Sequence, residues 1–149
     1  MSKQNKNVLL VTNATNEIEI QQIKYAHIQS KNHGTVIKLS LVHVIPMLPV
    51  SYFHIPSMAL LARRYSEEAQ NTIAFIGNEL NVPHCDQWLI TGKIRMEVLR
   101  LAKKLNTHFI LASSTSIQDL HKSFLFKQNK TPIKNINLIG DINLIGANL

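Results

Sequence analysis

Apolar and polar positions along the chain alternate between patterns typical of strands and patterns typical of helices. The apolar run 7–12 predicts a central strand, and the apolar positions of 35–45 predict a second strand. Between them we expect a helix that Thr15 caps and that ends before Gly34, because glycine readily adopts the left-handed conformation that follows a helix. The expected buried side of this helix consists of Ile18, Ile23 and Ala26, with Tyr25 as a further candidate.

A long amphipathic helix is the clearest periodic signal in the chain. It follows segment 46–56, which contains three prolines and which we expect to form a loop. Arg63 with Glu67, and Arg64 with Glu68, lie four positions apart, and we expect them to form ordinary exposed ion pairs. The apolar positions recur every three or four residues, as in a helix with one buried face, and they are Met58, Leu61, Ala62, Tyr65, Ala69, Ile73, Ile76 and Leu80.

The second half of the chain continues the alternation of strand and helix. Segment 85–90 predicts a third strand, Thr91 and Gly92 predict a turn, and segment 108–113 predicts a fourth strand. Between the turn and the fourth strand, apolar positions with helical spacing predict a helix, and they are Ile94, Val98, Leu101, Ala102 and Leu105.

The C-terminal segment contains the pentapeptide INLIG twice, six residues apart. Thr131 is expected to cap a short helix that starts at Pro132 and ends at Gly140. Segment 142–147 then predicts a fifth strand. Five strands that alternate with helices predict an α/β fold, in which one domain over 1–149 forms a doubly wound parallel sheet with helices on both faces.

The composition excludes several classes of protein. Of the 149 residues, 45% are hydrophobic and 17% are charged, which is typical of globular chains rather than disordered ones. No apolar run approaches the roughly 20 residues of a membrane-spanning helix, and we expect no signal peptide. Cys85 is the only cysteine, so no intramolecular disulfide forms. These features favour the cytoplasm.

The chain is basic, with 16 Lys and Arg against nine Asp and Glu and a formal net charge of +7. Such a charge is compatible with an acidic partner such as nucleic acid. Four of the lysines lie in the acid-free stretch 120–140. The few aromatic residues do not interleave with them as they do in a base-stacking surface, so a solvated basic face is the preferred interpretation.

Four segments in this order resemble the universal stress protein family. They are NVLLVTNAT at 7–15, LSLVHVIP at 39–46, ITGKIRMEVLRLAKKLNTHFILASS at 90–114 and INLIGA at 142–147. The resemblance spans essentially the whole chain, and segment 91–104 is most similar to the A-type members. It implies an adenine nucleotide alpha hydrolase-like fold, a five-stranded sheet of order 3-2-1-4-5 with a crevice between the first and fourth strands.

The resemblance also implies where a nucleotide would bind. In the nucleotide-binding branch of the family, an acidic residue after the first strand, a valine late in the second strand and a glycine-rich loop after the fourth strand hold ATP. By position, the acid corresponds to Asn13, the valine to Val44 and the loop to 113–130. The residues of this crevice are therefore expected to be Thr12, Asn13, Val44, Ala112, Ser113 and Ser114.

The expected crevice lacks the residues that phosphate binding favours. A phosphate loop turns several backbone N–H groups toward one point, which glycine permits, yet none of the five glycines lies in 110–130 or directly after the first strand. Phe124, Leu125 and Phe126 place bulky groups where such a loop is small, and Asn13 lacks the carboxylate that accepts hydrogen bonds from ribose. We therefore expect a degenerate crevice without tight ATP binding, in agreement with the A-type branch, which itself lacks the loop.

The remaining chemistry-bearing residues have structural explanations. The seven histidines show no metal-binding spacing, so no metal site is expected. His84, Cys85 and Asp86 are the residue types of a cysteine nucleophile, but sequence neighbours rarely converge in space as catalysis requires. Cys85 is interpreted as a packing residue or an incidental thiol, and Trp88 as part of the core or of an interface.

Three functions remain open from the sequence. The leading one is a cytoplasmic, homodimeric universal stress protein that has no catalytic activity and no cofactor and acts as a stress-response or interaction module toward a protein partner. The second is an ATP-binding member with a degenerate phosphate loop, and the third is a basic nucleic-acid-binding protein. The homodimer is expected to pair the C-terminal edge strand across a two-fold axis, as related proteins of the family do, through Ile142, Leu144 and Ile145.

Overall fold

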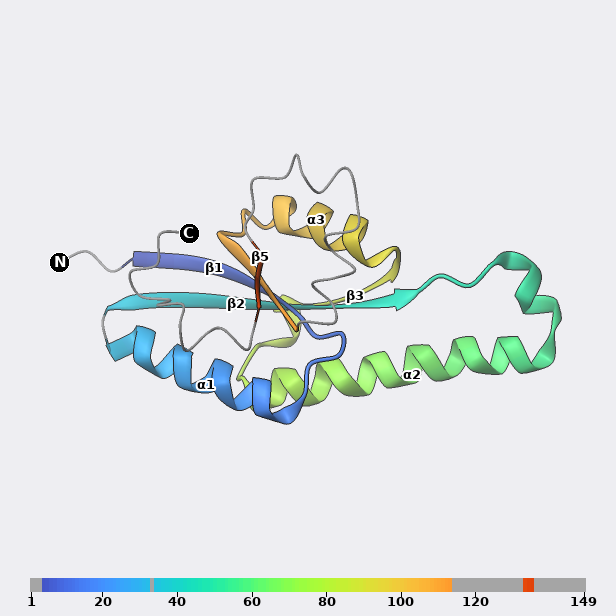
Figure 1. Ribbon diagram of the computed structural model, residues 1–149, viewed down its shortest axis with the longest axis horizontal. Helices are drawn as coiled ribbons and strands as arrows, with labels where there is room; N and C mark the ends of the chain where they lie inside the picture. The colour runs from blue at the N-terminus through green and yellow to red at the C-terminus, as the bar shows by residue number, and fades with distance from the viewer. Residues whose placement is uncertain (1–3, 33, 114–132, 136–149) are drawn as a thin grey trace.

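The computed structural model of the chain describes residues 4–32, 34–113 and 133–135 (Figure 1). The helices are α1 (Glu17–Asn32), α2 (Pro56–Glu79) and α3 (Ile94–Lys104). The strands are β1 (Gln4–Val11), β2 (Thr35–Pro46), β3 (Gln87–Gly92), β4 (Phe109–Ala112) and β5 (Ile133–Asn135). Two short 3₁₀ helices, η1 (Val50–His54) and η2 (His84–Asp86), precede α2 and β3.

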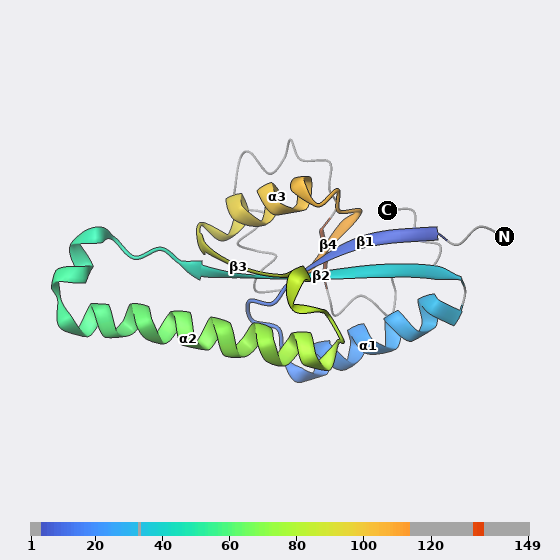
Figure 2. The same cartoon turned by 180° about the vertical axis from the view of Figure 1, so that it is seen from behind.

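The strands form one parallel sheet in the order β3-β2-β1-β4-β5. Helices α1 and α2 lie on one face of the sheet and α3 lies on the other, as both views show (Figures 1 and 2). The expected α/β class and the expected order of the first four strands are confirmed. The connections from β1 to β2 and from β2 to β3 run through α1 and α2, because a parallel pair needs a crossover rather than a hairpin.

The two faces of the sheet bury separate apolar clusters. On the face of α1 and α2, Leu10, Leu41 and Ile76 belong to one cluster. On the face of α3, Leu9, Val42 and Val98 belong to the other. Successive residues of a strand point to opposite faces, so the continuous apolar run of β1 supplies both clusters at once. Such double burial is typical of a strand inside a parallel sheet that helices cover on both faces.

The sheet is staggered, because β2 pairs with its two neighbours over different parts of its length. Its first residues, 35–42, pair with β1, whereas 41–46 pair with β3. Beyond Val42, β2 therefore pairs with β3 on one side and with no described strand on its other side. The chain then continues into η1 and α2, which extend past the end of α1 (Figure 1).

The first helix differs in detail from the prediction. It begins at Glu17, and Asn16 rather than Thr15 caps it: Asn16 Oδ1 accepts from the Glu19 N–H at 2.8 Å, and Glu19 Oε1 accepts from the Asn16 N–H at 3.0 Å. This is a reciprocal capping arrangement. The Thr15 hydroxyl instead donates to the Val11 carbonyl at 3.0 Å.

The buried side of α1 is also rotated from the expected one. Ile23 and Ala26 are buried, as predicted, together with Ile20. Ile18 and Tyr25, however, are 70% and 66% exposed, so their assignment to the core is wrong. The physical reason is that Ile20, Ile23 and Ala26 already occupy the stripe that faces the sheet, three to four positions apart, and Ile18 and Tyr25 lie outside it.

Helix α3 agrees with the prediction, but the turn predicted at Thr91 and Gly92 is wrong. Both residues belong to β3, because β2 continues beside them and pairs with Gly92 at Pro46. Val98, Leu101 and Ala102 are buried, and Ile94 and Leu105 pack against the same cluster while partly buried.

Gly34, which follows α1, has φ +82°, the left-handed conformation expected for it.

The C-terminal prediction is wrong where the structure describes it. Segment 132–139 was expected to be helical, but Ile133–Asn135 is β5, which pairs with β4 in the register Ile110↔Ile133. Pairing along a buried parallel strand outweighs a local helix signal that depends on one threonine and one proline. Thr131, Pro132, Gly140 and the expected strand 142–147 lie outside the described residues, and so do the proposed dimer contacts Ile142, Leu144 and Ile145.

Candidate functional site

Just after the carboxyl end of β1, the Asn13 side chain forms hydrogen bonds with the main chain of Val44 in β2. The Asn13 side chain donates from Nδ2 to the Val44 carbonyl at 2.9 Å, and Asn13 Oδ1 accepts from the Val44 N–H at 2.9 Å. A carboxamide presents one donor and one acceptor, as a peptide group does. The side chain therefore adds one more rung to the β1–β2 ladder after the main chain of β1 has turned away.

The residues around Asn13 hold this turn in place. The Thr12 N–H donates to the Val42 carbonyl at 2.9 Å, and Thr12 is completely buried. The Thr15 N–H donates to the Thr12 carbonyl at 3.2 Å, and Ala14 between them has φ 61°. A left-handed conformation is uncommon for a residue with a Cβ, so the surrounding bonds must impose it.

His43 belongs to the same region, although the sequence did not indicate it. Its Nδ1 lies 2.8 Å from Thr12 Oγ1, which also lies 3.2 Å from the Val42 carbonyl. Desolvation by burial lowers the pKa of His43 below its usual value of 6.5. The available signal was a polar residue between two apolar ones, because the side chain of His43 points to the sheet face opposite that of Val42 and Val44.

The other wall of the expected crevice is the end of β4. Ala112 and Ser113 are buried, at 0% and 4% exposure. Leu10 of β1 pairs with Leu111 of β4, and continuing this register places Ser113 beside Thr12. The structure thus brings Thr12, Asn13, Val44, Ala112 and Ser113 to one edge of the sheet, while Ser114 lies outside the described residues.

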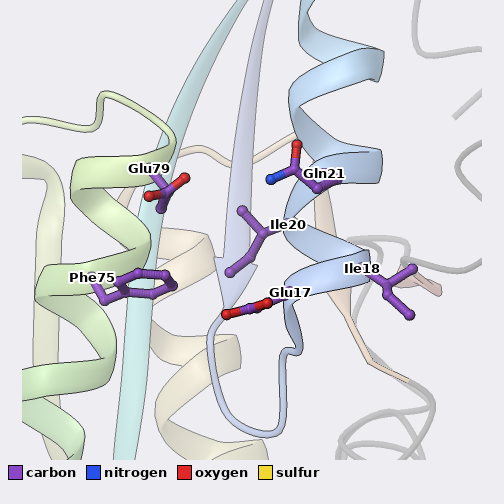
Figure 3. A pocket seen from close by; sticks show the side chains of 6 residues that line it. All are labelled: Glu17, Ile18, Ile20, Gln21, Phe75 and Glu79. Atoms are coloured by element: carbon purple, nitrogen blue, oxygen red, sulfur yellow. The ribbon is translucent and has the colours of Figure 1, made fainter.

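A hollow lies between α1 and α2, on the face of the sheet opposite α3. Its lining consists of Glu17, Ile18, Ile20 and Gln21 of α1 and Phe75 and Glu79 of α2. Figure 3 shows that Ile20 lies between the two helices and that Ile18 points away from α2. The volume of the hollow is about 390 Å³. Lys24 Nζ pairs with Glu79 Oε2 at 2.6 Å, which joins the two helices beside the hollow. We call this hollow the α1–α2 groove.

The described residues show no sign of metal or nucleophile chemistry. In 4–32, 34–113 and 133–135, no group of three or more His, Cys, Asp or Glu side chains could hold a metal ion. Cys85 is exposed in η2, so the interpretation as a packing residue is wrong and that of an incidental thiol remains. Trp88 is partly buried against the α3-side cluster, with Lys104 Nζ 5.0 Å from its ring centre. Over the same residues, no helix is long and apolar enough to cross a membrane.

Comparison with solved structures shows the fold class. A universal stress family protein from Burkholderia pseudomallei superposes with a TM-score of 0.58 at 13% identity, covering 86% of this chain and 92% of that one. A universal stress protein from Archaeoglobus fulgidus superposes with a TM-score of 0.51 at 11% identity, covering 86% and 95%. These likenesses show the fold: an α/β parallel sheet of the universal stress protein type.

A relative in sequence shows the family. Over 100 residues, 65% of this chain and 67% of the other, the protein is 30% identical to universal stress protein A homolog 1 of Coxiella burnetii. No sequence model of a protein family matches the chain. The chain belongs to the universal stress protein family, as the segments resembling it predicted.

Proposed function

We propose that this protein is a non-catalytic universal stress protein of the A-type branch, an interaction module that does not bind ATP tightly. The observation that supports the proposal is the pair of hydrogen bonds between the Asn13 carboxamide and the main chain of Val44. In the nucleotide-binding branch, these two positions hold ATP. Here the two residues bind each other.

The arrangement opposes nucleotide binding for two reasons. A ligand that needs the Val44 N–H or carbonyl must first displace Asn13, and each buried group left unpaired costs about 1–3 kcal/mol. A carboxamide also accepts hydrogen bonds less strongly than the carboxylate that the nucleotide-binding branch has at this position. The absence of glycine from 110–130 removes the usual phosphate loop as well.

Calorimetric titration and thermal unfolding with ATP and Mg²⁺ test this proposal. We expect little or no saturable heat at micromolar nucleotide and no increase in unfolding temperature. Stoichiometric binding with a rising unfolding temperature would contradict it, because a ligand of the native state must stabilise that state. The Asn13→Asp variant is a useful second sample, since it supplies the missing carboxylate while removing the donor to Val44. We expect that it also fails to bind, because the phosphate loop is still missing.

We further propose that the protein is cytoplasmic and forms a homodimer through its C-terminal strand. The apolar side chains Ile142, Leu144 and Ile145 and the lack of charge after Asp141 support this contact. Light scattering on the full chain and on a version that ends at Asp141 tests it. If the truncated version is folded and is still a dimer, the C-terminal strand is excluded as the contact.

A polyanion is the second candidate partner, because the basic residues gather on α3. Lys93, Arg95, Arg100, Lys103 and Lys104 lie at or in this helix with Glu97 as the single acid. Duplex DNA binding that weakens steeply with salt in the wild-type protein, and that is lost in Lys93→Gln/Lys103→Gln, would favour it over the interaction module. Our leading proposal expects no such binding at physiological salt.

A further inference from the structure

The outer face of α2, which is turned away from the sheet, is exposed over its whole length. The residues of this face follow one another every three or four positions, so they share one side of the helix. All of them are exposed, and they are Leu60, Arg64, Glu67, Asn71 and Phe75. Leu60 and Phe75 are 55% and 48% exposed, although both are large and apolar. Their apolar surface is available to a partner.

The apolar surface continues into the loop and η1 that precede α2. Met47, Val50, Tyr52 and Ile55 are all exposed, with Val50 reaching 78%. We call residues 46–68 the finger, because this segment projects beyond the sheet and beyond α1 in both views (Figures 1 and 2). No residue of α2 before Ala69 is buried. The finger therefore has apolar surface but little core of its own.

The arginines and glutamates of the finger form no ion pair with another described residue. Arg63, Arg64, Glu67 and Glu68 are exposed, and in the part of the chain that the structure describes none of them lies within ion-pair distance of an opposite charge. The expected pairs at four-residue spacing are therefore absent, which corrects that prediction. Both signs of charge remain available to a partner.

These side chains are arranged symmetrically about the midpoint between Tyr65 and Ser66. Two arginines come just before it and two glutamates come just after it. If two copies of the helix lie antiparallel about a two-fold axis at this midpoint, Arg64 faces Glu67 of the second copy, and Arg63 faces Glu68. The same operation places the start of the helix, at Pro56, opposite Phe75.

We propose that α2 pairs with α2 of a second copy of this chain, antiparallel about that axis. Each finger then lies along the partner, with its apolar loop against Phe75 and the neighbouring α1–α2 groove of the other copy. The contact is isologous, so every ion pair occurs twice. A second copy is the occupant that fits, because it presents the same charges in the reversed order that the finger requires.

The size of the finger agrees with a stable contact. One side of a specific interface comprises roughly 20–30 residues, and residues 46–68 number 23, which lies within that range. Phe75 and the wall of the α1–α2 groove add to it. This contact is independent of ATP binding and of the C-terminal strand, so it succeeds or fails separately from the proposed function.

Charge reversal provides the test, with the full chain analysed by sedimentation and light scattering over a wide range of concentration. One variant carries Arg63→Glu and Arg64→Glu, and the other carries Glu67→Arg and Glu68→Arg. In each variant alone, four like charges meet four like charges, so we expect association at least tenfold weaker than in the wild type. In an equal mixture, opposite charges face each other again, and we expect the association to return. Raising the salt concentration should reduce the difference.

A matched control changes the same amount of charge elsewhere. Lys93 is the N-cap residue of α3 and Lys103 lies in its last turn, on the other face of the sheet. The variant with Lys93→Glu and Lys103→Glu should associate like the wild type. Circular dichroism verifies that all variants are folded. The proposal is overturned if the wild type and both separate variants have the same oligomeric mass at all concentrations. A wild type that stays monomeric, with its finger covered by its own chain, is one such outcome. It is also overturned if the mixture does not recover.

Discussion

The two halves of α2 have the same apolar periodicity but opposite surroundings. In the second half, Ala69, Ile73 and Ile76 are buried against the sheet and α1. In the first half, Met58, Leu61 and Tyr65 continue the same stripe but are only partly buried. The difference arises because the second half lies over a sheet of several strands, whereas the first half has only the end of β2 and η1 beneath it. Periodicity shows which side of a helix is apolar, and the neighbouring elements decide how much of that side is buried.

The largest expected effect tests this difference directly. Ile76→Ala should lower the free energy of unfolding by about 2–5 kcal/mol, since it opens a cavity in a packed core. Leu61→Ala, in the first half, should cost about 1 kcal/mol or less, because solvent already reaches the side chain. Urea unfolding of both variants at one protein concentration measures the two values. Equal costs would show that the finger is packed as tightly as the core.

Asn13 braces the part of β2 that leads toward the first half of α2, through its two hydrogen bonds with Val44. Asn13→Asp should destabilise the protein by about 1–3 kcal/mol, because the carboxylate no longer donates to the Val44 carbonyl and instead repels it. Asn13→Ala should cost a similar amount by leaving both groups of Val44 unpaired. Hydrogen exchange should become faster at Val44 in both variants, and slower exchange there would contradict the bracing role of Asn13. The hydrogen-exchange rates of residues 98–102 of α3 serve as the internal reference.

Gly77 tests how closely the second half is packed. A Cβ at this position would overlap the Gln87 side-chain amide, whose Nε2 donates to the Val82 carbonyl at 3.0 Å. Gly77→Ala should therefore lower stability by about 1 kcal/mol, even though alanine is favoured over glycine in a helix by about that amount. Ser66→Ala in the first half is the comparison, and it should be neutral or slightly stabilising. Thermal unfolding compares the two, and stabilisation by Gly77→Ala would contradict the close packing.

The smallest expected effect concerns pH. Burial lowers the pKa of His43, so below its unfolded value of 6.5 the unfolded chain binds a proton that the folded chain binds less readily. Stability should therefore be full above this pH and fall as the pH decreases through and below 6.5. In His43→Asn the slope of unfolding free energy against pH should be smaller. The remaining slope includes His27, whose pKa is lowered by burial and by Lys31. Identical slopes would exclude a contribution from His43.

Much of the fold could be predicted from the sequence, because its signals are local and repeated. The apolar run that became β1, the helical spacing of Val98, Leu101 and Ala102, and the glycine at position 34 each depend on a few neighbouring residues. The family resemblance added the strand order, and the crevice residues from Thr12 to Ser113 do lie at one edge of the sheet. Absence of glycine from the expected phosphate loop was visible in the sequence as well.

What the sequence did not reveal depends on contacts between distant segments. Asn13 binding Val44 requires β1 to turn away from β2 at one particular rung, and nothing local specifies that rung. Ile18 is exposed because the sheet fills the neighbouring stripe of α1, and Ile133 is in a strand because β4 lies beside it. Local pattern determines which elements form and which of their sides is apolar. Tertiary packing alone determines how far the elements overlap, and it thereby brings Asn13 to Val44 and leaves the finger exposed.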